Sequence, residues 1–431
     1  MRLLSLLLLL LLVPRQAAAV CGDGVLDGSD VCDDGNTSGS DMCSADCTAF
    51  TFISAGTHPD ASTNASTTGK WIRKLVPYKF KLYPAYGDED YDSNAGTGPT
   101  NITPYNPATD TFPNEDTQES EAIDDIIIMA DKLFLPNIDY HHTSGSPTDV
   151  ETTAAYMVES GGAWTTGTVG TAYVHAYSMV RLGGDLFIAG AAGGIPTDGV
   201  VQVSTDGGSN WSTSLTIGPE DANTNARFYF IGKLGSNLYA QAYDITGDNL
   251  HTNSEVYNGS SWSSGTQLSP DLAFGQHPVE FGSYMIYKGA GNTLRKFDGT
   301  TDSLARTAVY DYTVHQGTLY ALETDNEIYT SSDADSFTLF AAGPSNSRSL
   351  GILNNRLYVG DTVGEIFVTE ILLRCGDLTI DGGETCDFTS LNSATCVSQG
   401  YASGTLACAN NCGSYDETAC SRGGLSGATL N

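Results

Sequence analysis

The stretch Ser236-Asn237-Leu238-Tyr239 joins a tight turn to a leucine and an aromatic residue, and variants of it recur along the chain. The seven copies are Phe80-Lys81-Leu82-Tyr83, Asp131-Lys132-Leu133-Phe134, Gly184-Asp185-Leu186-Phe187, Ser236-Asn237-Leu238-Tyr239, Ser283-Tyr284-Met285-Ile286, Gly317-Thr318-Leu319-Tyr320 and Asn355-Arg356-Leu357-Tyr358. Their spacing ranges from 34 residues (Met285 to Leu319) to 53 residues (Leu133 to Leu186). A repeat of that period indicates an array of similar supersecondary units.

A second motif follows most of these copies. It consists of an aromatic residue or valine, a turn rich in Asn, Asp, Gly and Ser, and often another aromatic residue, as in Tyr257-Asn258-Gly259 with Trp262. Short β-rich runs between such turns are typical of hairpins. Two hairpins per repeat make a four-stranded antiparallel unit, and a ring of such units is a β-propeller. The sequence therefore predicts the all-β fold class, with a seven-bladed β-propeller over residues 50–373.

The seventh copy is incomplete. It ends at Ile366-Phe367-Val368-Thr369 and lacks a final turn and strand. The strand-like segment Phe50-Thr51-Phe52-Ile53 stands just before the first blade. We expect this segment to supply the missing outer strand, because closing the ring removes an exposed sheet edge. The segment from Ala55 to Gly69 is rich in small polar residues and is expected to be a loop.

The N-terminus has the pattern of an export signal. Arg2 precedes an apolar run from Leu3 to Leu12, and Ala17-Ala18-Ala19 follows. This pattern predicts a signal peptide over residues 1–19, with the mature chain beginning at Val20. The run is about half of the ~20 residues that a spanning helix needs, so we expect no membrane span. A membrane anchor and a lipid-modified Cys21 are the alternatives. The expected location is secreted or at the cell surface.

The ten cysteines fall into two even clusters that frame the propeller: Cys21, Cys32, Cys43 and Cys47, then Cys375, Cys386, Cys396, Cys408, Cys412 and Cys420. Such clusters in an exported chain are typical of disulfide frameworks. Zinc is disfavoured because neither cluster contains a histidine. The spacing aligns the four front cysteines with Cys375, Cys386, Cys408 and Cys412. We therefore expect Cys396 to pair with Cys420, while the pairing within each shared set of four stays open.

Both clusters also share acidic and glycine residues. Cys21-Gly22-Asp23 through Cys32-Asp33 matches Cys375-Gly376-Asp377 through Cys386-Asp387 at identical spacing. These segments, with Cys32-Asp33-Asp34-Gly35-Asn36 and Gly39-Ser40-Asp41-Met42-Cys43, resemble the myxobacterial-type cysteine-rich repeat of extracellular proteins. The resemblance implies small extracellular modules, over residues 20–49 and 374–421, that are often linked to attachment or binding. A tail over residues 422–431 follows.

The front module is strongly acidic. Asp23, Asp33, Asp34, Asn36 and Asp41 offer hard oxygen ligands of the kind that calcium prefers. Calcium is therefore the cofactor we expect if there is one. The alternative is that these side chains stabilise turns, which Asx residues commonly do.

One local motif lies in the propeller, at Ser204, Asp206, Gly208 and Trp211. It resembles the Asp-box of sialidase-like propellers, and the resemblance implies a structural role on the outer side of a blade. Sialidase chemistry would also need three arginines around a carboxylate, a tyrosine nucleophile and an acidic partner. The Arg-Ile-Pro motif of that family is absent and arginines are few. A sialidase-like hydrolase is therefore the alternative to a non-catalytic protein.

The blade register predicts which residues meet at the channel. The strand before each leucine should be the innermost, so the residues eight to twelve positions earlier should ring one mouth. They are Trp71, Glu121, His175, Arg227, His277, Tyr310-Asp311 and Arg348. We expect a ligand site formed by Glu121, His175, Arg227, His277 and Arg348, because convergent polar groups can bind a polar ligand. The alternative is that these groups are polar only because a channel mouth is wet.

The net charge of −32 excludes two classes of partner. A polyanion repels nucleic acid and anionic lipid surfaces. The sequence thus predicts a secreted, non-catalytic recognition protein that binds an extracellular glycan or protein. A sialidase-like enzyme and a structural component of a surface layer are the alternatives.

Overall fold

The computed structural model describes residues 21–22, 31–33, 36–39, 42–88, 99–129, 131–137, 155–170, 173–192, 198–220, 224–244, 249–271, 277–354, 356–370, 386, 390–399, 401–408 and 415–421. The chain forms two compact units. One is Phe52–Ile371, and the other combines Met1–Thr51 with Leu372–Asn431. Among the described residues no helix is long and apolar enough to cross a membrane. The expected signal peptide and the C-terminal tail lie outside the described residues.

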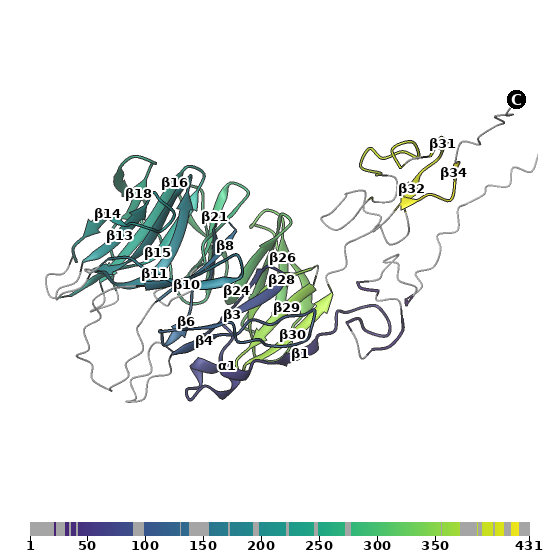
Figure 1. The fold of residues 1–431 in the computed structure, drawn as a ribbon, viewed down its shortest axis with the longest axis horizontal. Coiled ribbons are helices and arrows are strands. Elements are labelled where there is room, and N and C mark those ends of the chain that lie inside the picture. Colours follow the sequence, from purple (N-terminus) through teal and green to yellow (C-terminus); the bar gives the residue numbers. More distant parts are fainter. Residues whose placement is uncertain are drawn as a thin grey trace, which may run out of the picture. The chain divides into compact units, whose positions relative to one another are not determined.

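The first unit is a seven-bladed β-propeller, as the sequence predicts (Figure 1). Blade 1 contains β2 (Lys74–Tyr78), β3 (Lys81–Gly87) and β6 (Ala122–Ile123), with the inserted hairpin β4 (Thr100–Ile102) and β5 (Asp116–Gln118). Blade 2 contains β7 (Ile127–Met129), β8 (Lys132–Pro136), β9 (Ala155–Ser160) and β10 (Ala163–Thr168). Blade 3 contains β11 (Tyr173–Leu182), β12 (Asp185–Ala192), β13 (Gly199–Ser204) and β14 (Ser212–Ile217).

The remaining four blades follow in chain order. Blade 4 contains β15 (Ala226–Leu234), β16 (Asn237–Asp244), β17 (Asn249–Leu250), β18 (Ser254–Tyr257) and β19 (Trp262–Gly265). Blade 5 contains β20 (Val279–Phe281), β21 (Tyr284–Gly289), β22 (Thr293–Phe297) and β23 (Asp302–Arg306). Blade 6 contains β24 (Val309–His315), β25 (Thr318–Glu323), β26 (Glu327–Ser331) and β27 (Thr338–Ala342). Blade 7 contains β28 (Ser347–Leu353), β29 (Arg356–Asp361), β30 (Glu365–Glu370) and β1 (Ile53–Thr57).

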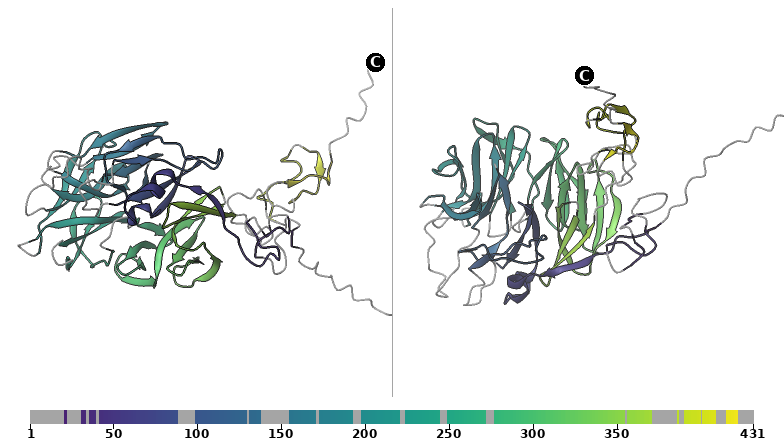
Figure 2. Two further views of the ribbon diagram at one scale, coloured as in Figure 1. Left: turned by 90° about the horizontal axis from the view of Figure 1, so that it is seen from below. Right: turned by 45° about the vertical axis from the view of Figure 1, so that its right-hand side comes forward.

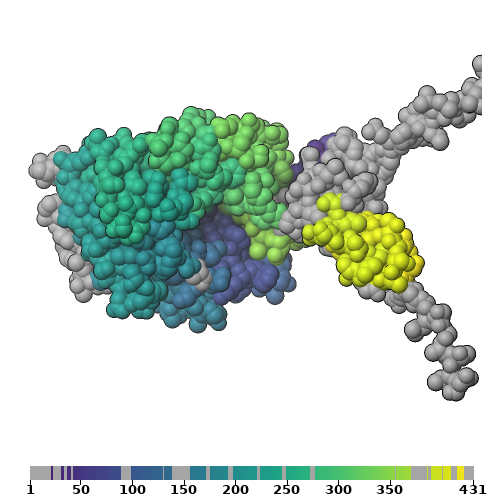
Figure 3. Space-filling model, turned by 90° about the horizontal axis from the view of Figure 1, so that it is seen from above, coloured from purple at the N-terminus to yellow at the C-terminus, as the bar shows by residue number. Residues whose placement is uncertain are grey.

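The repeated leucine and aromatic residue explain how the blades stack. They lie on the second strand of each blade, where neighbouring side chains point to opposite faces. The aromatic or branched side chain of one blade therefore meets the leucine position of the next. The buried pairs are Phe134 with Leu186, Phe187 with Leu238, Tyr239 with Met285, Ile286 with Leu319, and Tyr320 with Leu357. In Figure 3 the colours accordingly pass around one body in chain order.

The first strand of each blade is the innermost. The first strands of adjacent blades pack against one another, as β2 does on β28 and β11 on β15. Each begins at one end of the channel, which we call the mouth, and turns into its second strand at the other end, which we call the opposite face. Residues that immediately precede or begin these strands are therefore gathered at the mouth.

The N-terminal strand closes the ring. β1 pairs antiparallel with β30, from Ile53 opposite Val368 to Thr57 opposite Glu365. Figures 1 and 2 show β1, in purple, beside the light green last blade. The prediction of closure is confirmed, but the strand starts later than the expected Phe50–Ile53 segment. The Thr51 amide donates to the Met42 carbonyl at 3.0 Å, which ties that part of the chain to the front module.

The segment after β1 differs from the expected loop. It contains the helix α1 (Pro59–Thr63) and the 3₁₀ turn η1 (Thr68–Lys70). The His58 ring accepts a hydrogen bond from the Ala61 amide at 3.0 Å, and Pro59 stands at the start of the helix. A capping acceptor followed by proline favours helix initiation. The composition of small polar residues did not reveal this, because histidine is an uncommon cap.

The second unit contains four disulfide bonds among its described residues. Cys21 bonds to Cys47, Cys32 to Cys43, Cys386 to Cys408, and Cys396 to Cys420. The predicted Cys396–Cys420 bond is confirmed, and all four bonds stay within their clusters. Cys375 and Cys412 lie outside the described residues. The rear part also contains the short pairs β31 (Ser403–Gly404) with β34 (Cys420–Ser421) and β32 (Ala407–Cys408) with β33 (Tyr415–Asp416).

Candidate functional site

Arg348 lies at the mouth and contacts aromatic side chains from two other blades. It stands near the start of β28, and its guanidinium lies over the Trp71 ring at 4.3 Å and over the Tyr310 ring at 4.1 Å. The three residues come from blades 7, 1 and 6, so the closed ring brings them together. Burial lowers the pKa of Arg348 from its usual range. Among the described residues, no carboxylate forms an ion pair with this guanidinium.

His175 and Arg227 form a second cluster, on blades 3 and 4. The Arg227 guanidinium donates to the Tyr177 hydroxyl at 2.6 Å and to the Tyr229 hydroxyl at 2.9 Å. The His175 ring stacks on Tyr177 with centroids 5.4 Å apart. Tyr177, Tyr229 and Tyr243 continue the stack and are buried. Arg227 is thus held by neutral hydroxyl groups, and the polar part of the cluster is embedded in aromatic rings.

His277 connects opposite sides of the channel. Its Nδ1 lies 2.7 Å from a carboxylate oxygen of Asp125, which belongs to blade 2. The Tyr312 hydroxyl of blade 6 donates to the His277 carbonyl at 2.6 Å. Glu121 is buried just before β6, on the segment that pairs with β3 of blade 1.

Two acidic residues that the blade register did not predict lie at the start of the inner strand of blade 2. Asp124 and Asp125 precede β7, the innermost strand of blade 2, and both are buried. The Arg73 guanidinium donates to Asp124 at 2.6 Å. Burial raises the pKa of Asp124, and the Arg73 charge opposes that rise. Because β7 is short, the inner strand starts closer to the Leu133 repeat than the register assumes. This difference in strand length is what would have pointed to Asp124 and Asp125.

Two lysines at the channel were also missed. The Lys74 ammonium donates to Asp311 at 2.6 Å and to the Tyr312 carbonyl at 2.5 Å. Lys288 lies 3.8 Å from Asp271, a longer separation. Burial lowers the pKa of Lys288, and the positive charge of Arg348 lowers it further. Lys74 lies on β2 and Lys288 on β21, whose repeat copy has Met285-Ile286 in place of leucine and an aromatic residue, and no sequence pattern marked either lysine.

The charges at this end of the channel do not balance one by one. Arg73 and Lys74 each have a carboxylate within hydrogen-bonding distance. Lys288 has Asp271 at 3.8 Å, and Arg348 lies over two aromatic rings without an ion-pair partner among the described residues. Arg348 and Lys288 therefore lack the short ion pairs that Arg73 and Lys74 make.

A cavity of about 530 Å³ lies along the channel. First strands from several blades line it, and most of the lining side chains are apolar, such as Val76, Met179 and Val314. Its charged lining includes Lys74, Asp125 and His277, which also form the cross-channel contacts. The channel thus combines a polar layer with an apolar interior.

The motif around Asp206 forms a self-contained turn between β13 and β14. The Ser204 hydroxyl donates to Asp206 at 2.8 Å and accepts from the Gly208 amide at 2.8 Å. The Asn210 side chain and amide donate to the Asp206 carboxylate and hold its pKa at about 2. The Trp211 indole donates to the Gly208 carbonyl at 3.2 Å. These bonds stabilise the turn.

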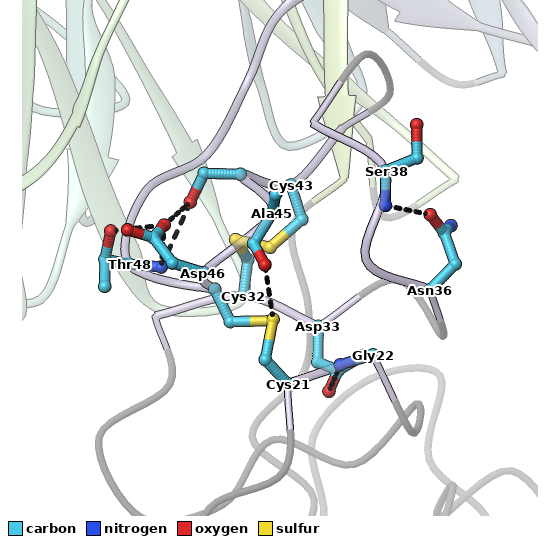
Figure 4. Close-up of a disulfide and its surroundings, with 12 residues drawn as sticks. Cys21, Gly22, Cys32, Asp33, Asn36, Ser38, Cys43, Ala45, Asp46 and Thr48 are labelled. Carbon is cyan, nitrogen blue, oxygen red and sulfur yellow. Dashed lines mark hydrogen bonds between the residues drawn. A yellow bond between two sulfur atoms is a disulfide. The ribbon is translucent and has the colours of Figure 1, made fainter.

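Two of the candidate calcium ligands of the front module, Asp33 and Asn36, are described, and both accept backbone hydrogen bonds. Asp33 accepts from the Gly22 amide at 2.8 Å, and Asn36 accepts from the Ser38 amide at 2.6 Å. Figure 4 shows the two side chains directed at these different partners. Asp23, Asp34 and Asp41 lie outside the described residues. The Asn36 contact closes a local turn, whereas the Asp33 contact joins segments eleven positions apart, and calcium binding stays a prediction.

Comparison with known proteins finds similarity at the level of fold. No family model and no curated protein sequence matches the chain. A virginiamycin B lyase from Staphylococcus aureus aligns with 11% identity and a TM-score of 0.45, covering 74% of this chain and 97% of the other. YCF48 from Cyanidioschyzon merolae aligns with 11% identity and a TM-score of 0.42, covering 74% and 98%. The WD40 β-propeller domain of Doa1 aligns with 10% identity and a TM-score of 0.44, covering 74% and 96%.

Proposed function

We propose that the protein is an extracellular, non-catalytic recognition protein that binds an anionic group of a glycan or protein ligand at the mouth. Arg348 is the main anchor and Lys288 supports it. The observation that carries the proposal is the Arg348 guanidinium, held between Trp71 and Tyr310 and without a carboxylate partner among the described residues. A guanidinium can donate two parallel hydrogen bonds to a carboxylate or related anion.

The two rings support this role in a specific way. The central carbon of the guanidinium lies 4.3 Å and 4.1 Å from the two ring centroids, and neither ring carries a charge that would compete with an anion for the N–H donors. Stacking also restricts the side chain before a ligand arrives, so less conformational entropy is lost on binding. Lys288 adds a second positive charge, and its own carboxylate, Asp271, stands at 3.8 Å. An anionic group would give Arg348 the charged partner that no described carboxylate supplies.

A glycoside-active enzyme is the second candidate, and one observation favours it. Burial raises the pKa of Asp124, which lies at the mouth. A carboxyl group with a raised pKa in a cleft is the usual form of a general acid. Against this role, Asp124 is engaged by Arg73 at 2.6 Å. The binding proposal therefore takes precedence, and Asp124→Asn separates the two candidates.

The test is a binding screen of the full chain against acidic glycans and acidic peptides. Arg348→Ala should weaken binding by about tenfold or more, which corresponds to a lost charged hydrogen bond. Arg348→Lys should restore little of it, because an ammonium is a point charge without the planar fork. Arg306→Ala is the matched control, since Arg306 also lies over Tyr329 but pairs with Glu323.

The results separate the candidates. Equal binding by wild type and Arg348→Ala would contradict the proposed anchor. Glycoside turnover that disappears in Asp124→Asn would replace the binding proposal with the enzyme. Binding without turnover, lost in Arg348→Ala and kept in Arg306→Ala, is the expected result.

A further inference from the structure

The turn between β2 and β3 uses unusual residues. Lys79 and Phe80 occupy its two central positions with φ of 44° and 64°. Non-glycine residues with positive φ are uncommon, and a bulky aromatic residue there is an outlier. The equivalent turns include Gly183-Gly184 in blade 3, Gly235 in blade 4 and Gly282 in blade 5. These are the residue types that such hairpin turns favour.

Phe80 is also exposed to solvent, so its aromatic ring gains no stabilisation from burial. Its side chain is 75% exposed, the largest value among the exposed large hydrophobic residues that the structure describes. An unfavourable backbone conformation combined with an exposed aromatic ring is a departure from local stability that often marks a functional site. The turn lies on the opposite face of the propeller from the mouth, because β2 runs from the mouth to this turn.

A pocket of about 400 Å³ adjoins this turn. Lys79, Lys81 and Tyr83 line it from blade 1, Glu159 and Trp164 line it from blade 2, and Glu115 lines it from the loop before β5. We call this set the blade 1–2 pocket. Its walls include the Tyr83 and Trp164 rings, whose centroids are 6.2 Å apart.

Two glutamates fix the geometry of the blade 1–2 pocket. Glu115 accepts from the Tyr83 hydroxyl at 3.0 Å, from the Trp164 indole at 3.1 Å and from Lys81 at 2.5 Å. Glu159 accepts from Lys79 at 2.8 Å and from the Gly162 amide at 2.6 Å. The aromatic rings and both carboxylates are therefore held in place before any ligand binds.

The charges and hydrogen-bond donors of the pocket indicate which class of ligand it can bind. The positive charges of the two lysines equal the negative charges of the two glutamates, so the pocket has no net charge that would attract an ion. Each ammonium has three donors, and the Lys79 and Lys81 side chains remain 44% and 30% exposed. The pocket therefore presents spare donors, carboxylate acceptors and aromatic faces together. Sugar rings carry hydroxyl groups at their edges and C–H groups on their faces, which match this combination.

We propose that the blade 1–2 pocket binds an uncharged sugar residue, with the Trp164 ring contacting its apolar face and the Glu115 and Glu159 pairs contacting its hydroxyl groups. Phe80 does not line the pocket, but it follows the lining residue Lys79 in the same turn, and we expect it to contact the next sugar of a chain that extends out of the pocket. This site is separate from the anion site at the mouth, since the two lie at opposite ends of β2. The protein would then recognise two chemically different groups on two faces.

The test measures binding of cellohexaose, maltohexaose and mannohexaose to the full chain by calorimetry. At least one probe should bind the wild type. Phe80→Gly should weaken that binding by about fivefold, yet keep or raise the melting temperature, because glycine accepts positive φ without strain. If Phe80 has only a structural role, Phe80→Gly should leave sugar binding unchanged while the melting temperature is kept or raised. This variant therefore keeps the test independent of misfolding.

A matched tryptophan pair completes the experiment. Trp164→Phe removes the indole donor to Glu115 and should weaken binding by about threefold or more. Trp262→Phe removes a comparable bond, to the Ser214 hydroxyl at 2.9 Å, and should leave binding unchanged. The proposal is overturned if no probe binds at about 10 mM, or if Phe80→Gly and Trp164→Phe bind like the wild type. Loss of sugar binding only in Arg348→Ala would assign it to the mouth instead.

Discussion

At the scale of single residues, three arginines show how the same stacking contact acquires different roles. Arg306 lies over Tyr329 at 3.7 Å and is neutralised by Glu323. Arg227 lies over Tyr177 and donates to neutral hydroxyl groups. Arg348 lies over Trp71 and Tyr310 and has no ion-pair partner among the described residues. The partner of the charge, rather than the aromatic contact, therefore decides whether a guanidinium is structural or a candidate for binding.

His58 gives a prediction at this scale. Its Nδ1 accepts from the Ala61 amide, and its Nε2 lies 2.8 Å from the Thr103 carbonyl, which fits a neutral ring that donates from Nε2. Burial lowers the pKa of His58 to about 4. The unfolded chain takes up the proton near pH 6.5, so stability is present above that pH and is lost as the pH falls toward 4. The loss is about 3 kcal/mol.

Chemical denaturation of the wild type and His58→Asn, from about pH 7.5 (roughly one unit above the unfolded value) down to about pH 4 (the folded value), measures this effect. Asparagine can still cap the helix but does not titrate. The difference in the free energy of unfolding between the two proteins should therefore shrink as the pH falls. Two parallel curves would show that His58 does not contribute to the pH dependence.

At the scale of elements, the strand β1 carries more of the fold than its length suggests. It is the outer strand of blade 7, and β30 has no other outer partner. Ser54 also donates to Glu365 at 2.7 Å, and the His58 amide donates to the Gly364 carbonyl at 2.7 Å. Removing β1 would expose the β30 edge and open the ring.

Two truncations test this contribution. Deletion of residues 20–57 should lower the melting temperature of the propeller far more than deletion of residues 374–431, in whose described residues no strand belongs to the propeller. Thermal unfolding followed by circular dichroism gives the comparison. Equal melting temperatures for the two truncated proteins would contradict closure by β1.

The elements also show what the sequence could and could not predict. The leucine–aromatic repeat predicted the second strand of every blade, because those positions are buried against the next blade. The channel residues were predictable only where the inner strand has regular length, as with Arg348. Because β7 is short, the inner strand of blade 2 starts later than expected, and Asp124 and Asp125 precede it instead of Glu121. Contacts across the channel, such as His277 with Asp125, join residues far apart in sequence, and no local pattern encodes them.

At the scale of the whole molecule, the dominant quantity is a net charge of −32 on 431 residues. Like charges in a compact chain repel and destabilise it, and salt screens this repulsion. The ion pairs at the mouth are largely buried, so screening affects them less. The melting temperature should therefore rise between about 10 mM and about 300 mM NaCl. A fall over that range would mean that attractive pairs outweigh the general repulsion.

The pairing of β1 with β30 also has a consequence in time. Ser54 and Glu365 are separated by 311 positions. A ribosome adds roughly 5–20 residues per second, so β1 is made roughly 15–60 s before its partner exists. Throughout that interval the growing protein is an open arc with a waiting strand at its start. A β1 from a second chain could fill the vacant edge during the same interval, so crowded synthesis would favour strand-exchanged dimers over closed monomers.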